Sequence, residues 1–164
     1  MGTSFRFGSH LPVLIKCVEK TVGDILELGC GESSTIFLHW ACLHKERKLV
    51  TMESKKNYYD RFRKIKNHCH TVLYVPDWSK AVLSGDWSVV LIDQSPGFAR
   101  GMLLPKFVDA EYVVCHDSHV TDKTYGYDFS LFKYRFDYKP KPEWIPQTTV
   151  VSNKHNLEGL MDDA

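Results

Sequence analysis

The stretch Asp24-Ile-Leu-Glu-Leu-Gly-Cys-Gly31 gives the clearest indication of the fold of this 164-residue chain, because a short apolar run ends there in two glycines. A run of this length that is closed by glycines is typical of a buried strand. Ser33, Ser34 or Thr35 can begin a helix directly afterwards. Glycines at such a turn let the backbone approach a ligand closely, and the N–H groups that open the next helix are free to bind it. The stretch therefore predicts a ligand-binding turn between a strand and a helix.

Outward from this stretch, strand-like runs alternate with helix-like runs, which is the pattern of an α/β layer fold. Four further buried strands are expected at residues 49–53, 70–75, 87–93 and 111–115. Five helices are expected. Ser9 is expected to cap the first, whose apolar face carries Leu11, Leu14, Ile15 and Val18, and the second follows Ser33 with Ile36, Phe37, Trp40 and Ala41 on one side. The third has a buried stripe of Tyr58, Phe62 and Ile65, the fourth lies at about 80–83, and the fifth lies at about 99–109 and is shortened by Pro105.

The C-terminal part has a different pattern. Residues 131–139 alternate strictly between apolar or aromatic and charged side chains, which indicates an antiparallel or edge strand. A second run at 148–151 follows the proline-rich loop 140–146, so the two runs predict a long-looped hairpin. The aromatic face of the first run is expected to pack against the helices that cover the sheet. The predicted fold is a doubly wound α/β, Rossmann-like, seven-stranded and mostly parallel sheet with an antiparallel C-terminal hairpin.

Length and composition indicate one globular domain over residues 1–164, with its core at about 9–153. The formal net charge of +1 gives no reason to expect nucleic acid as a partner, and the longest apolar runs are too short to cross a membrane. The five cysteines are an odd number without metal-site spacing, which favours a reducing compartment. No secretory signal is visible, so a cytoplasmic location is expected.

An acidic residue, Glu53, ends the second strand and lies 22 positions after Gly31. At the tip of a neighbouring parallel strand its carboxylate can accept hydrogen bonds from both ribose hydroxyls of a nucleotide, so the pattern predicts an adenosine-containing ligand. A dinucleotide site favours a third glycine at position 34, where this chain has serine; S-adenosylmethionine carries no phosphate and tolerates a looser turn. A nucleotide (NAD)-dependent oxidoreductase, a non-catalytic binding or assembly module, and a purely structural turn stay open as alternatives.

The same residues resemble a known family. The stretch 24–31 is similar to motif I of the class I S-adenosylmethionine-dependent methyltransferases, Glu53 to their acidic residue after strand two, and Leu91-Ile-Asp93 to the motif that closes strand four. The segment Ile92-Asp-Gln-Ser-Pro-Gly97, together with His116-Asp117, resembles a compact, little-characterised methyltransferase-like subgroup. The resemblance covers about 9–153 and implies a seventh strand inserted antiparallel between the fifth and the sixth.

The resemblance also implies a site. The expected cofactor is S-adenosyl-L-methionine, with S-adenosyl-L-homocysteine as product, and the residues expected to bind it are Glu27, Gly29, Cys30, Gly31, Ser33, Ser34, Glu53, Ser54, Asp77 (near the adenine), Trp78 and Asp93. Parallel strands present their carboxyl ends to the ligand. The candidate catalytic residues are therefore those that end strands four and five or follow them, namely Asp93, His116, Asp117 and His119.

The acceptor is expected to be a small molecule that is methylated on oxygen or nitrogen, because no recognition domain accompanies the core. No metal is predicted, since Asp93 and Asp117 supply only two carboxylates and the asparagine found in metal-dependent relatives is replaced by Ser118. The basic run at 55–66 is expected to be the solvated face of a helix. An exposed terminal strand would allow a homodimer.

Overall fold

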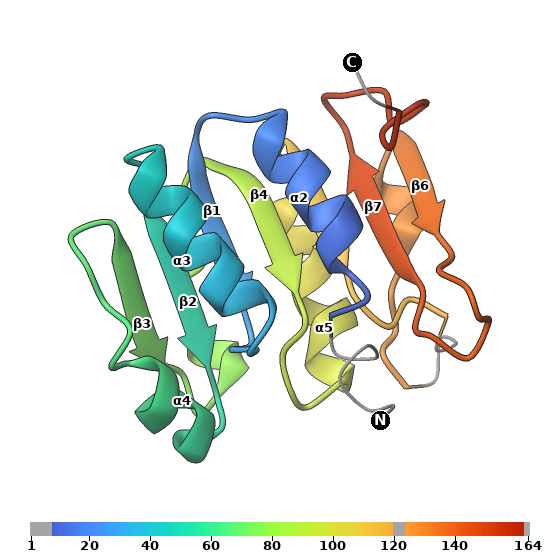
Figure 1. The fold of residues 1–164 in the computed structure, drawn as a ribbon. Coiled ribbons are helices and arrows are strands. Elements are labelled where there is room, and N and C mark those ends of the chain that lie inside the picture. The colour runs from blue at the N-terminus through green and yellow to red at the C-terminus, as the bar shows by residue number, and fades with distance from the viewer. Residues whose placement is uncertain (1–7, 120–123, 163–164) are drawn as a thin grey trace.

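A seven-stranded sheet in the order β3-β2-β1-β4-β5-β7-β6 forms the centre of the computed structural model, which describes residues 8–119 and 124–162 (Figure 1). The strands are β1 (Asp24–Leu28), β2 (Leu49–Glu53), β3 (His70–Tyr74), β4 (Trp87–Ile92), β5 (Tyr112–Cys115), β6 (Tyr134–Tyr138) and β7 (Thr148–Ser152). The first five are parallel, whereas β7 pairs antiparallel with both β5 and β6. This arrangement confirms the predicted fold, including the insertion of β7 between β5 and β6.

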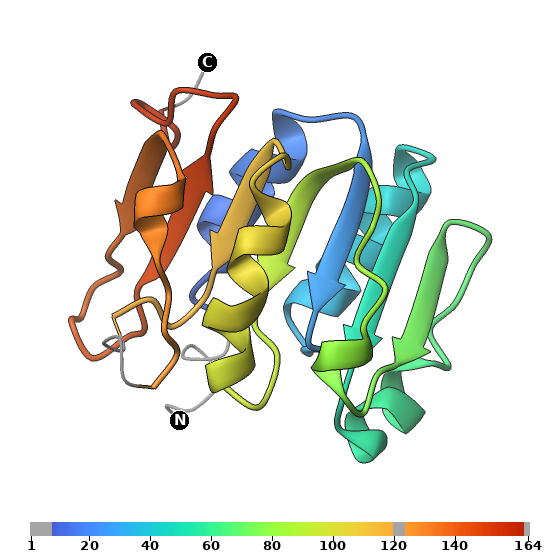
Figure 2. The same ribbon diagram turned by 180° about the vertical axis from the view of Figure 1, so that it is seen from behind.

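Helices lie on both faces of the sheet. Figure 1 shows α2 (Leu11–Glu19) and α3 (Ser34–His44) in front of it, with α4 (Lys56–Phe62) near the ends of β2 and β3. Figure 2 shows α5 (Phe98–Leu103) and the short 3-10 turns on the opposite face. The 3-10 turns are η1 (Trp78–Lys80), η2 (Leu104–Phe107) and η3 (Phe129–Leu131).

The central strands are apolar throughout because both of their faces are covered. In β4, Val89 and Leu91 belong to the core under α2 and α3, and Val90 and Ile92 belong to the core under α5. Asp93 follows at the carboxyl end of β4, next to the end of β1. The strand order reverses between these two strands, and ligands bind at such a switch point in open α/β sheets.

Helix α3 presents a different face to the sheet from the one that its apolar residues suggested. Its buried side chains are Ser34, Thr35, Leu38, His39 and Cys42. Trp40 is 62% exposed, and Ile36 lies at the solvent side as well. The helix is apolar on both sides, so periodicity did not select one. Two small hydroxyl side chains are buried instead, and that of Thr35 donates hydrogen bonds to the Glu27 carboxylate in β1.

Four smaller expectations were also wrong. The strand expected to be buried at 70–75 is the edge strand β3, in which only His70 is buried. The helix expected at 80–83 is absent, and only η1 forms just before it. Tyr58 is 40% exposed rather than part of a buried stripe, although Phe62 is buried. Ser9 is not the cap of α2: the capping position is His10, which makes no side-chain capping bond. Separately, no helix within the described ranges has an apolar stretch long enough to span a membrane.

Candidate functional site

The turn after β1 packs tightly against the chain that leaves β4. Gly29 has a φ of +94°, and a Cβ atom at this position would lie 2.8 Å from the backbone of Asp93 and Gln94. A side chain is therefore excluded both by conformation and by space. At Gly31 a Cβ atom would meet only the Ser34 hydroxyl, at 3.1 Å. The first glycine is thus required by the approach of another chain segment, and the second borders open space.

Glu53 joins the glycine turn to the end of β2. Its side chain is buried, and its two oxygens accept hydrogen bonds from the backbone N–H groups of Cys30, at 2.8 Å, and Lys55, at 2.6 Å. A carboxylate held by two N–H groups is fixed in position. The acidic residue and the turn, which were predicted separately from the sequence, therefore form one unit beside the switch point.

Glu27 lies beneath this turn with no exposed surface. Its carboxylate accepts hydrogen bonds from the hydroxyls of Thr35, at 2.9 Å, and Thr51, at 2.8 Å. Burial raises its pKa to about 7, even though the hydrogen bonds from Thr51 and Thr35 oppose the rise. The Thr51 hydroxyl also lies 2.9 Å from Nε2 of His70, so Glu27 ends a buried chain of hydrogen bonds. In this position Glu27 supports the turn from below.

The ends of β2, β3 and β4 are tied together by one carbonyl group. The oxygen of Ser95 accepts hydrogen bonds from Ser54 Oγ, at 2.6 Å, and from Trp78 Nε1, at 2.7 Å. The segment after β4 therefore reaches past the end of β1 to the ends of β2 and β3. Every residue in these contacts lies at the carboxyl edge of the sheet.

A mostly apolar pocket of about 410 Å³ lies beside Asp77, on the β3 side of this edge. It is lined in part by Met52, Val75 and Ala81. The Asp77 carboxylate accepts a hydrogen bond from the Ser79 N–H, at 3.0 Å, and stays partly exposed. Lys80 also lines the pocket and lies 3.5 Å from the Asp77 carboxylate, so the rim carries one charge of each sign.

Four charged or titratable side chains gather at the ends of β4 and β5. Arg100 of α5 is buried and forms ion pairs with Asp93, at 2.8 Å, and with Asp117, at 3.0 Å. Nδ1 of His116 lies 3.0 Å from an oxygen of Asp93. The side chains of Asp93 and Asp117 are 22% and 20% exposed, so the two carboxylates are the part of the cluster that solvent reaches.

The electrostatics of this cluster follow from its burial and its pairing. Burial alone would lower the pKa of His116, but the carboxylates of Asp93 and Asp117 together outweigh it and raise that pKa above its ordinary value. Burial alone would raise the pKa of Asp93, and the charges of His116 and Arg100 hold it below its ordinary value instead. A second histidine, His10, lies against His116 with ring centroids 4.6 Å apart. Burial lowers the pKa of His10 to about 4.

Of the predicted catalytic residues, the structure brings together Asp93, His116 and Asp117, whereas His119 is exposed and has no described contact with them. Sequence reasoning missed Arg100 and His10. Arg100 follows Gly97 within a helix that contains no other charge, and a lone arginine there was a signal that could have been noted. Ser9 was assigned to capping, yet its Oγ lies 3.0 Å from Nε2 of His116.

The chain is similar to known proteins in its fold alone. No protein-family model matches the sequence, and no curated protein matches it. Solved structures do match. Podospora anserina methyltransferase PaMTH1, bound to S-adenosylhomocysteine, has a TM-score of 0.57 and 14% identity over 92% of this chain and 79% of its own. The human methyltransferase 10 domain containing protein has a TM-score of 0.56 and 10% identity over 92% and 83%.

A third match is a mutant of MtNAS in complex with S-adenosylmethionine, with a TM-score of 0.57 and 12% identity over 90% of this chain and 62% of the other. Across these three structures, this chain spans between 62% and 83% of the other chain's length. The strand order, the inserted antiparallel strand and these matches agree. The chain has the fold of the class I S-adenosylmethionine-dependent methyltransferases.

Proposed function

We propose that this chain binds S-adenosylmethionine at the carboxyl edge of its sheet and transfers the methyl group to an oxygen or nitrogen of a small molecule. The observation that carries the proposal is the unit formed by Glu53 and the glycine turn beside the switch point. Ligands bind at this point in open α/β sheets. An acidic side chain fixed there can accept hydrogen bonds from two neighbouring hydroxyls of a ribose.

The cofactor's parts match the chemistry along this edge. Glu53 is the candidate for the ribose, and the apolar pocket next to Asp77 is the candidate for the adenine. Gly31 leaves room for the chain of the amino acid part. Glu27 acts through Thr35 to hold the turn rather than by direct contact, because its carboxylate is fully buried.

The carbonyl of Ser95 bridges the region that the adenosine would occupy. It bonds to Ser54 and Trp78, and all three residues follow carboxyl ends of strands. We therefore expect the segment after β4 to release these two hydrogen bonds when the cofactor binds. The donors that it frees, the Ser54 hydroxyl and the Trp78 indole N–H, become available to the ligand.

The acceptor would meet Asp93, His116 and Asp117. Methyl transfer from a sulfonium is an in-line displacement with a good leaving group, so the protein has mainly to position the acceptor and to receive its proton. Asp93 is the reachable member of the pair, and His116 behind it can share the proton across a distance of 3.0 Å. Arg100 holds both carboxylates in place.

Calorimetric titration of the purified protein with S-adenosylhomocysteine tests the proposal, with NAD(H) titrated in parallel. We expect micromolar binding of the first ligand only. The Glu53→Gln variant keeps the shape of the side chain but loses its charge, and it should bind about ten- to a hundredfold more weakly. Glu32→Gln, which removes a carboxylate that is 69% exposed, is the matched control and should bind normally.

Each alternative has its own signature in the same titration. Binding of NAD(H) alone would overturn the proposal in favour of an oxidoreductase. Absence of heat with either ligand, together with an unchanged melting temperature, would overturn it in favour of a binding or assembly module. Equal binding by the Glu53→Gln variant would remove the observation on which the proposal rests.

A further inference from the structure

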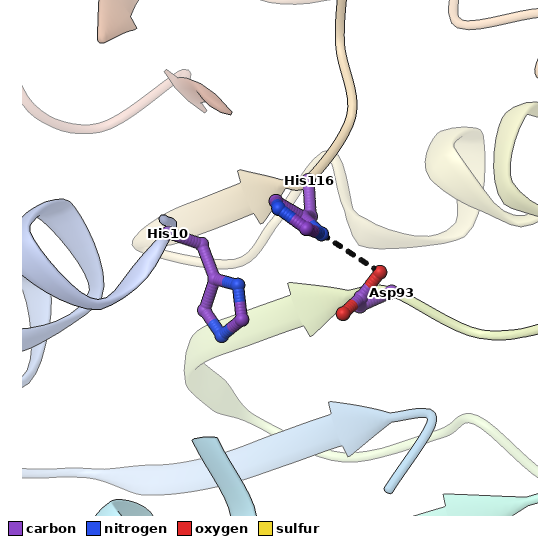
Figure 3. A group of neighbouring side chains, drawn as sticks. All are labelled: His10, Asp93 and His116. Atoms are coloured by element: carbon purple, nitrogen blue, oxygen red, sulfur yellow. Dashed lines mark hydrogen bonds and ion pairs between the residues drawn. The ribbon is translucent and has the colours of Figure 1, made fainter. Parts of the chain in front are cut away.

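Three side chains from distant parts of the chain converge at one point (Figure 3). His10 comes from the segment just before α2, Asp93 follows β4, and His116 follows β5. One nitrogen or oxygen atom of each lies within 4.8 Å of the others. Within the described ranges, no other group of three such side chains has this geometry.

His10 is the member that packing does not explain. Its side chain is 1% exposed, and among the residues that the structure describes neither of its ring nitrogens has a hydrogen-bond partner. A buried polar group without a partner costs about 1–3 kcal/mol. An aliphatic side chain at this position would avoid that cost. A ligand bound to one ring nitrogen would explain why the position holds an imidazole.

The distance between His116 and Asp93 fits a shared cation. Two ligand atoms that lie about 2.1 Å from one ion, at an angle between about 90° and 110°, are about 3.0–3.4 Å apart. Nδ1 of His116 and the nearest oxygen of Asp93 are 3.0 Å apart. His10 lies further away, within 4.8 Å, and a rotation of its ring would bring a nitrogen towards the same point.

Neighbouring residues orient His116 and Asp93 in the way that second-sphere residues orient the ligands of a metal ion. Nε2 of His116 lies 3.0 Å from the hydroxyl of Ser9, which leaves Nδ1 directed at Asp93. Arg100 fixes the Asp93 carboxylate through an ion pair of 2.8 Å to the same oxygen, Oδ1, that lies near His116. Partners of this kind set the tautomer of a ligating histidine and the orientation of a ligating carboxylate.

We propose that His10, Asp93 and His116 bind one divalent first-row transition metal ion. Two imidazoles and one carboxylate suit zinc, iron, cobalt or nickel, whereas magnesium and calcium favour oxygen ligands alone. Three protein ligands leave at least one position of the ion free, as in catalytic metal sites. The free position faces the partly exposed side of Asp93, since both histidines are buried.

The site also suggests what the ion does, and this step rests on the proposed function. The free position adjoins the place assigned to the methyl acceptor. A hydroxyl oxygen bound to a divalent ion has a lowered pKa, so it loses its proton to solvent at neutral pH. Its oxygen then forms the bond to the methyl carbon, and the electron pair of the broken C–S bond goes to sulfur, which becomes a thioether. With the ion bound, Asp93 and His116 therefore act on the acceptor as ligands of the ion, and solvent replaces them as the proton acceptor.

Titration of untagged, EDTA-stripped and dialysed protein with Co²⁺ tests the site without any cofactor present. We expect one Co²⁺ ion per chain and a higher melting temperature. The bound ion should show visible d–d absorption bands typical of four- or five-coordinate Co²⁺ with nitrogen ligands. Zn²⁺ should displace the Co²⁺ and abolish the bands, whereas Mg²⁺ should not.

Variants then assign the ligands. His10→Gln and Asp93→Asn should each weaken Co²⁺ binding by at least about tenfold. His68→Gln, which removes an exposed histidine, is the matched control and should bind Co²⁺ as the unaltered protein does. The bands of the unaltered protein keep the test valid if a variant fails to fold. Their absence, or stoichiometric binding that survives in a folded His10→Gln variant, would overturn the inference.

Failure of this inference is separable from failure of the proposed function. Co²⁺ binding without binding of S-adenosylhomocysteine would support the metal site and overturn the proposed cofactor. The reverse result would overturn the metal site and leave the proposed cofactor supported.

Discussion

Replacing Glu27 by glutamine should change how the stability of the protein depends on pH. Glu27 is fully buried, and its pKa is raised from 4.5 to about 7, mainly by burial. Because the folded state holds this proton more tightly than the unfolded state, the contribution of Glu27 to stability is complete below about pH 4.5. It is lost as the pH rises through 7. A rise of this size corresponds to about 3 kcal/mol.

A neighbouring histidine works in the opposite direction over nearly the same pH range. Burial lowers the pKa of His70 from 6.5 to about 4, and the nearby His39 lowers it further. His70 therefore destabilises the folded state as the pH falls from about 6.5 to 4. The groups that face Glu27 are the hydroxyls of Ser34 and Thr35 from α3, Thr51 of β2 with His70 of β3 behind it, and the charge of Asp93 after β4.

Urea unfolding in EDTA at pH 5, 6, 7 and 8 measures the effect as the free energy of unfolding of the unaltered protein minus that of Glu27→Gln. This difference should fall by about 2.5 kcal/mol across the series, with most of the change below pH 7. In the variant the His70 titration is no longer opposed, so its own stability should rise between pH 5 and 6.5. Glu32→Gln controls for the loss of one surface carboxylate.

A difference that stays constant within about 0.5 kcal/mol from pH 5 to 8 would refute this reasoning, because it would mean that Glu27 has the same pKa in both states. A difference that rises with pH would refute it more strongly. In that case the hydrogen bonds from Thr35 and Thr51 would outweigh burial and hold the carboxylate in its charged form.

Four further substitutions have expected outcomes that separate structural from binding roles. Gly29→Ala should lower the free energy of unfolding by at least about 2 kcal/mol in urea titrations, because φ is +94° and the backbone after β4 is too close for a Cβ atom. Gly31→Ala should cost less stability and should weaken S-adenosylhomocysteine binding in calorimetry. Arg100→Met should destabilise the fold by about 3–5 kcal/mol, since it leaves two carboxylates without their cation; a variant as stable as the unaltered protein would contradict the buried ion pairs. Trp40→Ser should change the free energy of unfolding by no more than about 0.5 kcal/mol, and a larger loss would mean that this exposed ring packs against something.

The parts of the fold that the sequence predicted are those set by local pattern. The run from Asp24 to Gly31 carries its strand, its turn and the start of its helix within a dozen residues, and Glu53 closes a second strand in the same way. The alternation in 131–139 likewise specified an antiparallel strand without reference to the rest of the chain. Each of these patterns indicates the type of one element and how it is buried, so neighbouring elements were not needed to interpret it.

The buried side of helix α3 could not be predicted from local pattern. Apolar side chains lie on both of its sides, and the side that is buried contains Ser34, Thr35 and His39. What selects that side is the buried carboxylate of Glu27, which needs hydroxyl donors above it. An unsatisfied buried carboxylate costs more than the exposure of one indole ring, so the polar requirement outweighs the burial of Trp40. The requirement involves two elements at once and has no signature in either alone.

The same limit explains why His10 was missed while Asp93 and His116 were predicted. The latter two end parallel strands, and strand ends of a doubly wound sheet share one edge, so topology alone brought them together. His10 precedes a helix whose first turn contains a proline, and this local sequence does not predict which residues His10 contacts. Only the path of the chain before α2 places its ring against His116. A local pattern can thus identify residues at the edge of a sheet, whereas a ligand set completed by a helix start becomes visible once the helix has been packed.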